Sequence, residues 1–300
     1  MALRLSMWEK NWPEVGAALR GGAPGFLFMR KPQDIGNNVP VFCYHTVERE
    51  AFVADLDFLA ANGYRTMSAD GLLSHMMGEE PAPARSVVLT FDDGARNLYE
   101  VVYPALKQRG MVGVAFVCAG LHKEPGEQAA IINGHAGIVP PLDWVQMREM
   151  HRDGVIDFQS HGLRHAPVPD WPEQATLLGV SDDWIELVEL PETSVRDEFA
   201  RARAILEEKL DKTVLHLAFP CYKGTEEGLR IVADCGYRAA WWGVMAGRAF
   251  NRPGDSPWQV TRWSGEFVRR LPGEGRRPLD RILWDRYGGT LDRVLGTVRK

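Results

Sequence analysis

Residues Val87–Gly94, with the sequence Val-Val-Leu-Thr-Phe-Asp-Asp-Gly, constrain the fold more than any other stretch of this chain. The apolar run predicts a strand buried on both faces, which is typical of a parallel sheet covered by helices. Asp92 and Asp93 stand at its end, where ligands bind in α/β folds. Two adjacent carboxylates repel each other unless a cation or a shared proton relieves them. They also suit the start of a helix at Asn97, so this stretch alone indicates either a site or a helix-start signal.

Strand-like and helix-like segments alternate along most of the 300 residues. The further strand-like runs are Val39–Tyr44, Val112–Cys118, Val155–Phe158, Val214–Phe219 and Ala239–Val244. The helix-like segments are Ala51–Asn62, Asn97–Arg109, Asp143–Arg152, Ser194–Leu210 and Glu226–Cys235. This alternation predicts an α/β fold with a largely parallel sheet, either open or closed into a barrel. No internal segment has the composition of a linker, so we expect a single domain.

The composition narrows the class of function. A net charge of −5 without a basic run argues against a nucleic-acid partner. No apolar stretch approaches the ~20 residues that a transmembrane segment needs. The polar residues within Trp8–Asn11 interrupt any signal-peptide core, so the chain as written is expected to be cytoplasmic. The composition leaves the oligomeric state open.

Polar groups follow the ends of four predicted strands, where barrels assemble active sites from several strands. These groups are His45, Asp92 with Asp93, His161 with His165, and Pro220–Gly224. Two histidines and one aspartate form a three-ligand set with open positions, which suits zinc and other divalent transition metals. Such a site acidifies bound water and polarises a carbonyl, while the second aspartate remains available as a general base.

Three of these segments resemble, in order and spacing, the motifs of the polysaccharide deacetylases (carbohydrate esterase family 4). They are Thr90-Phe91-Asp92-Asp93-Gly94, Ser160-His161-Gly162-Leu163-Arg164-His165 and Ala218-Phe219-Pro220-Cys221-Tyr222-Lys223-Gly224. The resemblance extends from about Val39 to Trp263. It implies a distorted (β/α) barrel, with seven parallel strands, that removes an acetyl group from a sugar by hydrolysis.

The same resemblance implies a role for each motif residue. Asp92 would be the base that activates metal-bound water, and Asp93, His161 and His165 would be the metal ligands. Zinc is the expected ion, although cobalt, nickel, manganese or iron also suits this ligand set. The expected partner is a carbohydrate substrate.

The third motif departs from the family's pattern at two points. Ala218 stands where many members carry an arginine that steadies the base, and Arg262 is the expected substitute. Cys221 occupies the usual tyrosine position and Tyr222 comes one residue later. The backbone N–H of either residue is therefore the expected oxyanion donor.

The general acid is a further departure. Many members use a late histidine in a Leu-x-His motif, but no histidine follows His216. His45 lies in a Tyr-His pair like that of members acting on extracellular or biofilm polysaccharides. It is the expected replacement, and a purely structural, hydrogen-bonded histidine is an equally compatible interpretation.

We expect three regions in the chain. Residues 1–38 form an N-terminal extension, residues 39–265 the barrel, and residues 266–300 a C-terminal tail. Residues 166–190 interrupt the alternation after the histidine motif and are interpreted as an insertion. Trp171 and Trp184, within that insertion, are candidates for contact with a substrate.

Three functions are compatible with these residues. The first is metal-dependent deacetylation of an N-acetylated sugar or polysaccharide. The second is hydrolysis of an amide on a small or lipid-linked sugar, by deacetylation or deformylation. The third is an inactive barrel that binds a sugar, suggested by the altered third motif and the missing late histidine.

Overall fold

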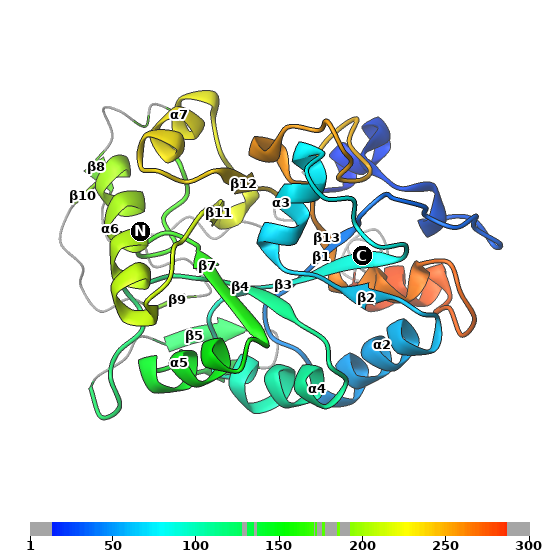
Figure 1. Ribbon diagram of the computed structural model, residues 1–300, viewed down its shortest axis with the longest axis horizontal. Coiled ribbons are helices and arrows are strands. Elements are labelled where there is room, and N and C mark those ends of the chain that lie inside the picture. Colours follow the sequence, from blue (N-terminus) through cyan, green and yellow to red (C-terminus); the bar gives the residue numbers. More distant parts are fainter. Residues whose placement is uncertain are drawn as a thin grey trace, which may run out of the picture.

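The protein, seen here in a computed structural model, is built around one curled sheet of parallel strands (Figure 1). The structure describes residues 14–127, 131–134, 137–170, 172, 176–177, 185–186 and 193–286. The seven main strands are β1 (Val41–Tyr44), β3 (Ser86–Asp93), β4 (Gly113–Val117), β7 (Ile156–Ser160), β11 (His216–Ala218), β12 (Ala239–Trp241) and β13 (Trp263–Ser264). The short β2 (Arg65–Thr66) pairs in parallel with the beginning of β3.

The order of the strands is that of an incompletely closed barrel. From β1 to β12 each main strand lies beside the next one in the chain, and the last strand, β13, pairs with β1. Between β12 and β13 the sheet is open, and one parallel bridge from Trp241 to Val260 spans the gap. This arrangement confirms the predicted distorted (β/α) barrel with seven parallel strands.

Helices cover the outside of the sheet. They are α2 (Arg49–Ala61), α3 (Ala69–Met77), α4 (Tyr103–Gln108), α5 (Trp144–Arg152), α6 (Val195–Leu210) and α7 (Glu226–Asp234). Ser194 caps α6 through the amide of Asp197, and Thr225 caps α7 through the amide of Gly228. Each cap fixes the residue at which its helix begins, and therefore the position at which the preceding loop ends.

Shorter elements complete the described part of the chain. Short 3-10 or π turns lie at Ala18–Gly22, Gly25–Leu27, Leu98–Val102, Pro220–Tyr222, Pro257–Gln259 and Gly265–Arg270. Two small antiparallel sheets join β5 (Ile131–Gly134) to β6 (Gly137–Val139) and β9 (Ile185–Glu186), and β8 (Thr176–Leu177) to β10 (Thr193–Ser194). Most of the predicted insertion, with Trp171 and Trp184, lies outside the described residues. Residues 279–286 of the predicted tail are helical.

Strand β3 shows why its sequence is apolar without alternation. All eight of its residues are buried. Leu89 and Phe91 join the apolar cluster beneath the helices, whereas Val88 packs with Val114 and Phe116 in a second cluster. Because both faces of the strand meet apolar neighbours, most of its residues before the carboxyl end are apolar, and the hydroxyl of the buried Thr90 donates to the carbonyl of Phe42.

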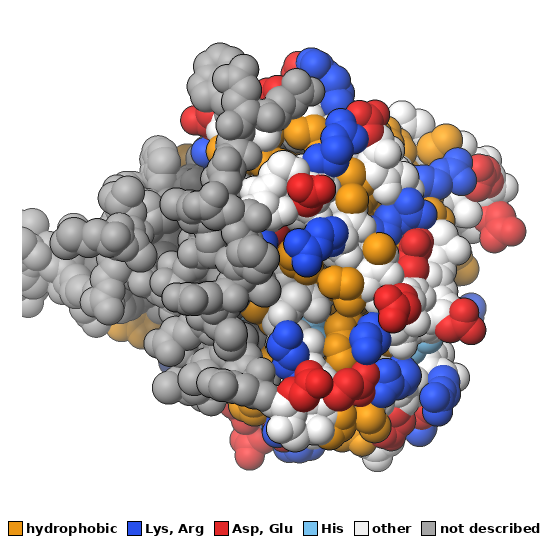
Figure 2. Space-filling model, turned by 90° about the vertical axis from the view of Figure 1, so that its left-hand side faces the viewer, with side chains coloured by type: hydrophobic (Ala, Val, Ile, Leu, Met, Phe, Trp, Pro, Cys, Tyr) orange, Lys and Arg blue, Asp and Glu red, His pale blue; other side chains and the backbone are white. Residues whose placement is uncertain are grey.

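The surface shows a mixture of charges. On the face in Figure 2, the Lys and Arg side chains of the described residues alternate with Asp and Glu and form no broad basic patch. Within the described residues, no helix is both long enough and apolar enough to cross a membrane.

Candidate active site and metal centre

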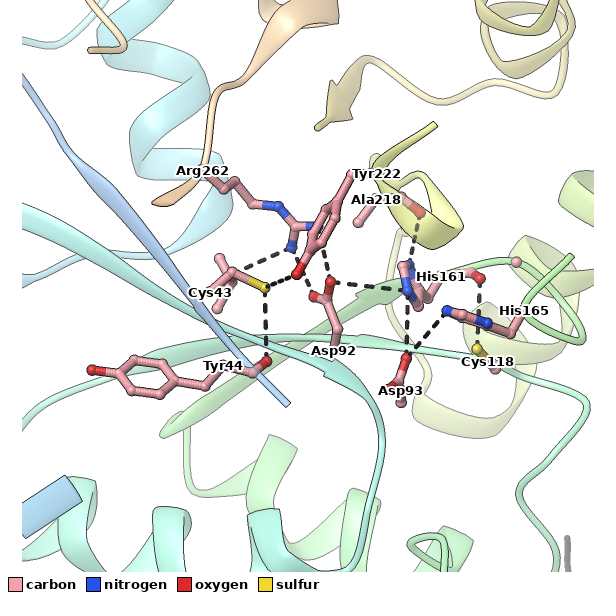
Figure 3. Close-up of polar contacts among 12 residues, drawn as sticks. Cys43, Tyr44, Asp92, Asp93, Cys118, His161, His165, Ala218, Tyr222 and Arg262 are labelled. Carbon is pink, nitrogen blue, oxygen red and sulfur yellow. Dashed lines mark hydrogen bonds and ion pairs between the residues drawn. The ribbon is translucent and has the colours of Figure 1, made fainter. Parts of the chain in front are cut away.

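The candidate site lies at the carboxyl ends of β1, β3, β7 and β11. The structure brings Asp92, Asp93, His161 and His165 together there, with Tyr222 on one side (Figure 3). Arg262 precedes β13 instead, and its side chain reaches this edge from the neighbouring strand. The four central side chains are at most 7% exposed, so their charges interact with little screening by solvent.

A turn at the end of β3 allows both aspartates to face the site. Successive side chains on a strand point to opposite faces, so neighbouring carboxylates would ordinarily diverge. Asp93, however, has φ 72° and Gly94 has φ 85°, both in the left-handed region. The bend turns Asp93 inward, and both carboxylates come within 4 Å of Nε2 of His161, at 3.9 Å for Asp92 and 3.5 Å for Asp93. An aspartate tolerates this backbone conformation better than most residues.

Three side chains form a cluster with the shape of a metal site. Oδ1 of Asp93 lies 3.5 Å from Nε2 of His161 and 3.5 Å from Nε2 of His165. One potential ligand atom from each residue fits within a span of 4.8 Å. His165 has φ 62°, so a second left-handed residue turns this imidazole back toward the site. Among the described residues, this is the group of at least three such side chains that could hold a metal ion.

The tautomer of His161 follows from its backbone contact. Its Nδ1 lies 2.8 Å from the carbonyl oxygen of Ala218 and donates a hydrogen bond to it. Burial lowers the pKa of His161 to about 4, so the ring is neutral near pH 7 and Nε2 carries a lone pair. That lone pair faces the carboxylate of Asp93. A second residue that fixes the remaining ring nitrogen in this way is typical of metal-binding histidines.

The buried oxygen of Asp93 provides a test of whether a cation fits. Within the described part of the chain, Oδ1 is buried and accepts no hydrogen bond. Burying a carboxylate oxygen without a hydrogen-bond donor costs folding free energy. Nε2 of His161 cannot act as that donor, because it carries a lone pair. A divalent cation among these atoms would satisfy both. The residues present therefore fit a metal ion with nitrogen and oxygen ligands.

Asp92 has a different partner. Nη1 of Arg262 donates to Oδ1 at 2.7 Å, and Nη2 donates to Oδ2 at 2.9 Å. Burial alone would raise the pKa of Asp92, but the guanidinium of Arg262, together with His161 and His45, outweighs burial and holds that pKa well below its usual range. Asp92 is therefore ionised, and the fork of Arg262 fixes the orientation of its carboxylate.

Arg262 is itself held from several directions. Its Nε donates to the carbonyl of Trp242 at 2.8 Å, and Nη1 also donates to Oγ1 of Thr90 at 3.3 Å. The guanidinium carbon lies 5.3 Å from the ring centre of Phe116 and 5.4 Å from that of Tyr222. These contacts keep a buried cation in one position, which is what a residue that orients a carboxylate must do.

The turn after β11 is strained at two consecutive residues. Cys221 has φ 54° and Tyr222 has φ 57°, although neither is glycine. The amide of Tyr222 donates to the carbonyl of Phe219 at 3.1 Å and so closes the turn. The hydroxyl of Tyr222 contacts Sγ of Cys43 at 3.6 Å. Burial raises the pKa of the Cys43 thiol to about 12, so it is not an activated nucleophile.

His45 follows β1 and is partly buried at the margin of the site. Its ring meets the ring of Tyr222 edge to face, with 6.2 Å between centres. Its charge, when protonated, lies close enough to Asp92 to help lower the pKa of that carboxyl, after the larger effects of burial and Arg262. The structure thus places His45 next to Tyr222 and near Asp92, at the end of the first strand.

One buried residue beside the site was missed in the sequence. Glu198, on α6, is fully buried and accepts hydrogen bonds from the histidine loop. It lies 35 residues after Leu163, its contact in that loop, so no local spacing connects the two. The available signal was a glutamate among apolar residues on the inward face of a helix, which indicates a partnered buried charge.

Comparison with known proteins identifies relatives of this chain. The family model for polysaccharide deacetylases matches residues 79–240 of the 300-residue chain. YxkH of Bacillus subtilis, which carries that family name, is 24% identical over 209 residues, covering 67% of this chain and 62% of its own. The poly-beta-1,6-N-acetyl-D-glucosamine N-deacetylase of Escherichia coli is 28% identical over 119 residues, covering 39% of this chain and 18% of its own. The chain thus spans less than two thirds of the length of either relative.

A solved structure resembles the whole barrel. The structure of IcaB from Ammonifex degensii superposes with a TM-score of 0.58 and 25% identity, covering 76% of this chain and 92% of IcaB. The residues that the family model matches contain β3 and β7, the strands that carry the aspartate and histidine motifs. The comparison agrees with the curled seven-stranded sheet described above.

Proposed function

Because this chain belongs to the polysaccharide deacetylase family, we propose that it hydrolyses the N-acetyl group of an amino sugar, with a divalent metal at Asp93, His161 and His165. The family consists of hydrolases, and its E. coli relative is named for cleavage of an acetyl amide, a carbon–nitrogen bond. The observation that carries the proposal is the ionised carboxylate of Asp92, held by Arg262 beside the cluster of Asp93 and two histidines.

The donor set supports zinc as the first choice. Two imidazoles and one carboxylate are a common zinc ligand set that leaves a position open for the reaction. Cobalt, nickel, manganese and iron bind the same donors. When bound, the cation would polarise the acetyl carbonyl and acidify the attacking water, which lets a weakly basic carboxylate accept its proton.

Asp92 takes the role of general base in this proposal. Its carboxylate must be ionised to accept a proton, and the fork of Arg262 keeps it so despite complete burial. The same fork occupies one lone pair on each oxygen and leaves the carboxylate in one orientation. Oδ2 lies 3.9 Å from Nε2 of His161, so the base adjoins the ligand cluster without being part of it.

Two further groups complete the reaction. We propose that the oxyanion donor is a backbone N–H of the turn after β11, at Cys221 or Tyr222, because this turn lies at the same edge of the sheet as Asp92 and His161. We assign His45 as the general acid, since its imidazole lies at the margin of the site beside Tyr222 and can donate a proton to the departing amine.

The proposed substrate is a polymer of N-acetylglucosamine or a fragment of one. The name of the E. coli relative supports this choice of sugar. In this chain, Tyr222 is 42% exposed as a whole residue, beside the catalytic groups. An exposed aromatic face suits the apolar C–H surface of a sugar ring.

Release of acetate tests the proposal. The protein is stripped of metal with a chelator, reloaded with Zn²⁺, and assayed with β-1,6-linked N-acetylglucosamine oligomers, a monomeric N-acetyl sugar and an N-formyl sugar. We expect acetate release from the oligomers that depends on the added metal. Formate release, or activity on the monomer alone, would favour the amide hydrolase of small sugars. Absence of turnover in the metal-loaded protein with every substrate would contradict the enzymatic proposal.

A further inference from the structure

The loop from His161 to His165 is shaped by a carboxylate that lies outside the family motifs. We infer that Glu198 of α6 is a positioning residue for the metal centre. Its buried carboxylate holds the loop backbone in the conformation that turns both imidazoles toward Asp93. The inference rests on the proposed metal site and goes beyond it, because Glu198 touches none of the three ligands' donor atoms.

The carboxylate of Glu198 makes three contacts with the loop. Oε1 accepts hydrogen bonds from the backbone N–H of Leu163 at 2.8 Å and from that of Arg164 at 2.7 Å. Oε2 accepts from Nε of Arg164 at 3.0 Å. The side chains of Glu198 and Arg164 are at most 1% exposed, so water does not replace these bonds. Two consecutive amides of the metal loop therefore depend on one side chain.

Three other backbone groups of the loop form hydrogen bonds with β4 and the residues that follow it. The amide of His161 donates to the carbonyl of Val117 at 2.9 Å. The amides of Ala119 and Gly120, beyond the end of β4, donate to the carbonyls of Gly162 at 3.0 Å and Leu163 at 2.8 Å. The β4 side thus holds the carbonyls of Gly162 and Leu163, and Glu198 holds the amides of Leu163 and Arg164. Removal of Glu198 would release one side of the loop only.

The loop conformation is one that needs external support. Gly162 has φ 83° and His165 has φ 62°, so the chain turns through the left-handed region twice within four residues. A Cβ at residue 162 would lie 3.2 Å from Oε1 of Glu198, which shows how closely the carboxylate approaches the backbone. A left-handed histidine persists only where its neighbours fix it. Its orientation as a ligand therefore depends on the preceding amides.

Helix α6 gives Glu198 a rigid position. Glu198 lies in the first turn of the helix, which Ser194 caps through the amide of Asp197 at 3.0 Å. The hydroxyl of Tyr237 donates to the carbonyl of Phe199 at 2.9 Å, and its oxygen lies at hydrogen-bond distance, 2.8 Å, from Oγ of Ser160. This link ties the start of α6 to the end of β7, directly before the metal loop. Small displacements of the carboxylate are therefore resisted by the fold.

A pair of substitutions tests the inference. Glu198→Gln keeps the shape of the side chain, but its amide group must face either the two backbone donors or Nε of Arg164, so at least one donor loses its acceptor. Glu198→Asp keeps the charge and shortens the reach, and it serves if the glutamine variant folds poorly. Glu208→Gln, on the exposed side of the same helix, is the matched control. Zn²⁺ affinity is measured by competition with a chelator, and the Co²⁺-substituted proteins are compared by their visible absorption.

We expect both Glu198 variants to bind Zn²⁺ roughly 10–100-fold more weakly than the wild type, the range found when groups supporting metal ligands are altered. Their Co²⁺ spectra should change, and Glu208→Gln should match the wild type in both measurements. Unchanged Zn²⁺ affinity and Co²⁺ spectra in both variants would overturn the inference, whatever their melting temperatures. A wild-type protein that binds no Zn²⁺ would instead overturn the proposed metal site, and the inference with it.

Discussion

Asp92 and Asp93 are adjacent in the sequence and equally buried, yet they have opposite surroundings. Asp92 faces a guanidinium that donates to both of its oxygens. Asp93 faces two imidazoles and has an oxygen that accepts no hydrogen bond from the described residues. The difference supports the proposed division of one motif into two functions: the first carboxylate has its cation within the protein, whereas the second would gain one only from a bound metal ion.

The Asp92 side and the Asp93 side of the site also differ in the contacts that hold their side chains in place. Arg262, on the Asp92 side, is fixed by the carbonyl of Trp242, by Thr90 and by two aromatic rings. The histidines on the Asp93 side depend on a loop whose amides are held by Glu198. We therefore expect changes on the Asp92 side to affect turnover and stability, and changes on the Asp93 side to affect metal binding first.

Replacing Asp93 should have the largest effect. Asp93→Asn removes the charge that offsets the cation and one of three ligands, so we expect Zn²⁺ affinity to fall by about 100-fold or more and acetate release to drop to background. Metal content after gel filtration and acetate release measure the two effects. A variant that retains stoichiometric zinc and wild-type turnover would show that the two carboxylates are not divided as described.

Replacing His45 should affect turnover and spare the metal. If His45 protonates the leaving amine, His45→Gln lowers kcat by about 10²–10⁴-fold, the usual contribution of a positioned acid, while KM and metal content change little. His151→Gln, on helix α5, is a control for the loss of a histidine away from the site. A His45→Gln enzyme with normal kcat would assign His45 a structural role.

Replacing Arg262 should weaken the fold. Arg262→Gln leaves the carboxylate of Asp92 buried without its cation, and breaking one side of a buried pair costs about 3–5 kcal/mol of unfolding free energy. The double variant Asp92→Asn/Arg262→Gln removes both charges and should be less destabilised than Arg262→Gln alone. Urea denaturation checks both. Arg196→Gln, which breaks an exposed pair with Asp234, should cost under about 1 kcal/mol, and an equal cost for Arg262→Gln would contradict the account.

Asp55 extends the comparison to a third buried carboxylate. Burial raises its pKa to about 7, although Nε of Arg269 lies 3.1 Å away and Tyr44 donates to it at 3.2 Å. The folded state thus binds a proton that the unfolded state releases near pH 4. This contribution to stability is present below pH 4 and is lost as the pH rises through about 7.

The expected slope is at most about 1.4 kcal/mol of unfolding free energy per pH unit, and Asp55→Asn should flatten it. Urea denaturation between pH 5 and pH 8 measures the slope. Asp57→Asn, exposed on the same helix and paired with Arg109, is the control and should leave the slope unchanged. An identical slope in the Asp55 variant would contradict the idea that burial dominates where no guanidinium fork is present.

The sequence predicted the parts of this site that depend on local pattern. The apolar run before Asp92 predicted the buried strand, and the placement of His161 and His165 after a strand end predicted that they would lie near the aspartates. The left-handed turn at Asp93 was not predictable from composition, since aspartate adopts that conformation only where its surroundings favour it. Glu198 was missed because its contact with the loop arises from packing of α6 against β7, which no sequence period encodes.

The central claim is that Asp92 acts on the reaction without holding the metal. The most direct test measures zinc content and acetate release together in Asp92→Asn, with Asp93→Asn as the matched variant. The account predicts that Asp92→Asn retains stoichiometric zinc while kcat falls by about 10²-fold or more. Wild-type turnover in Asp92→Asn, or loss of its zinc to the same extent as in Asp93→Asn, would contradict the division between the two carboxylates.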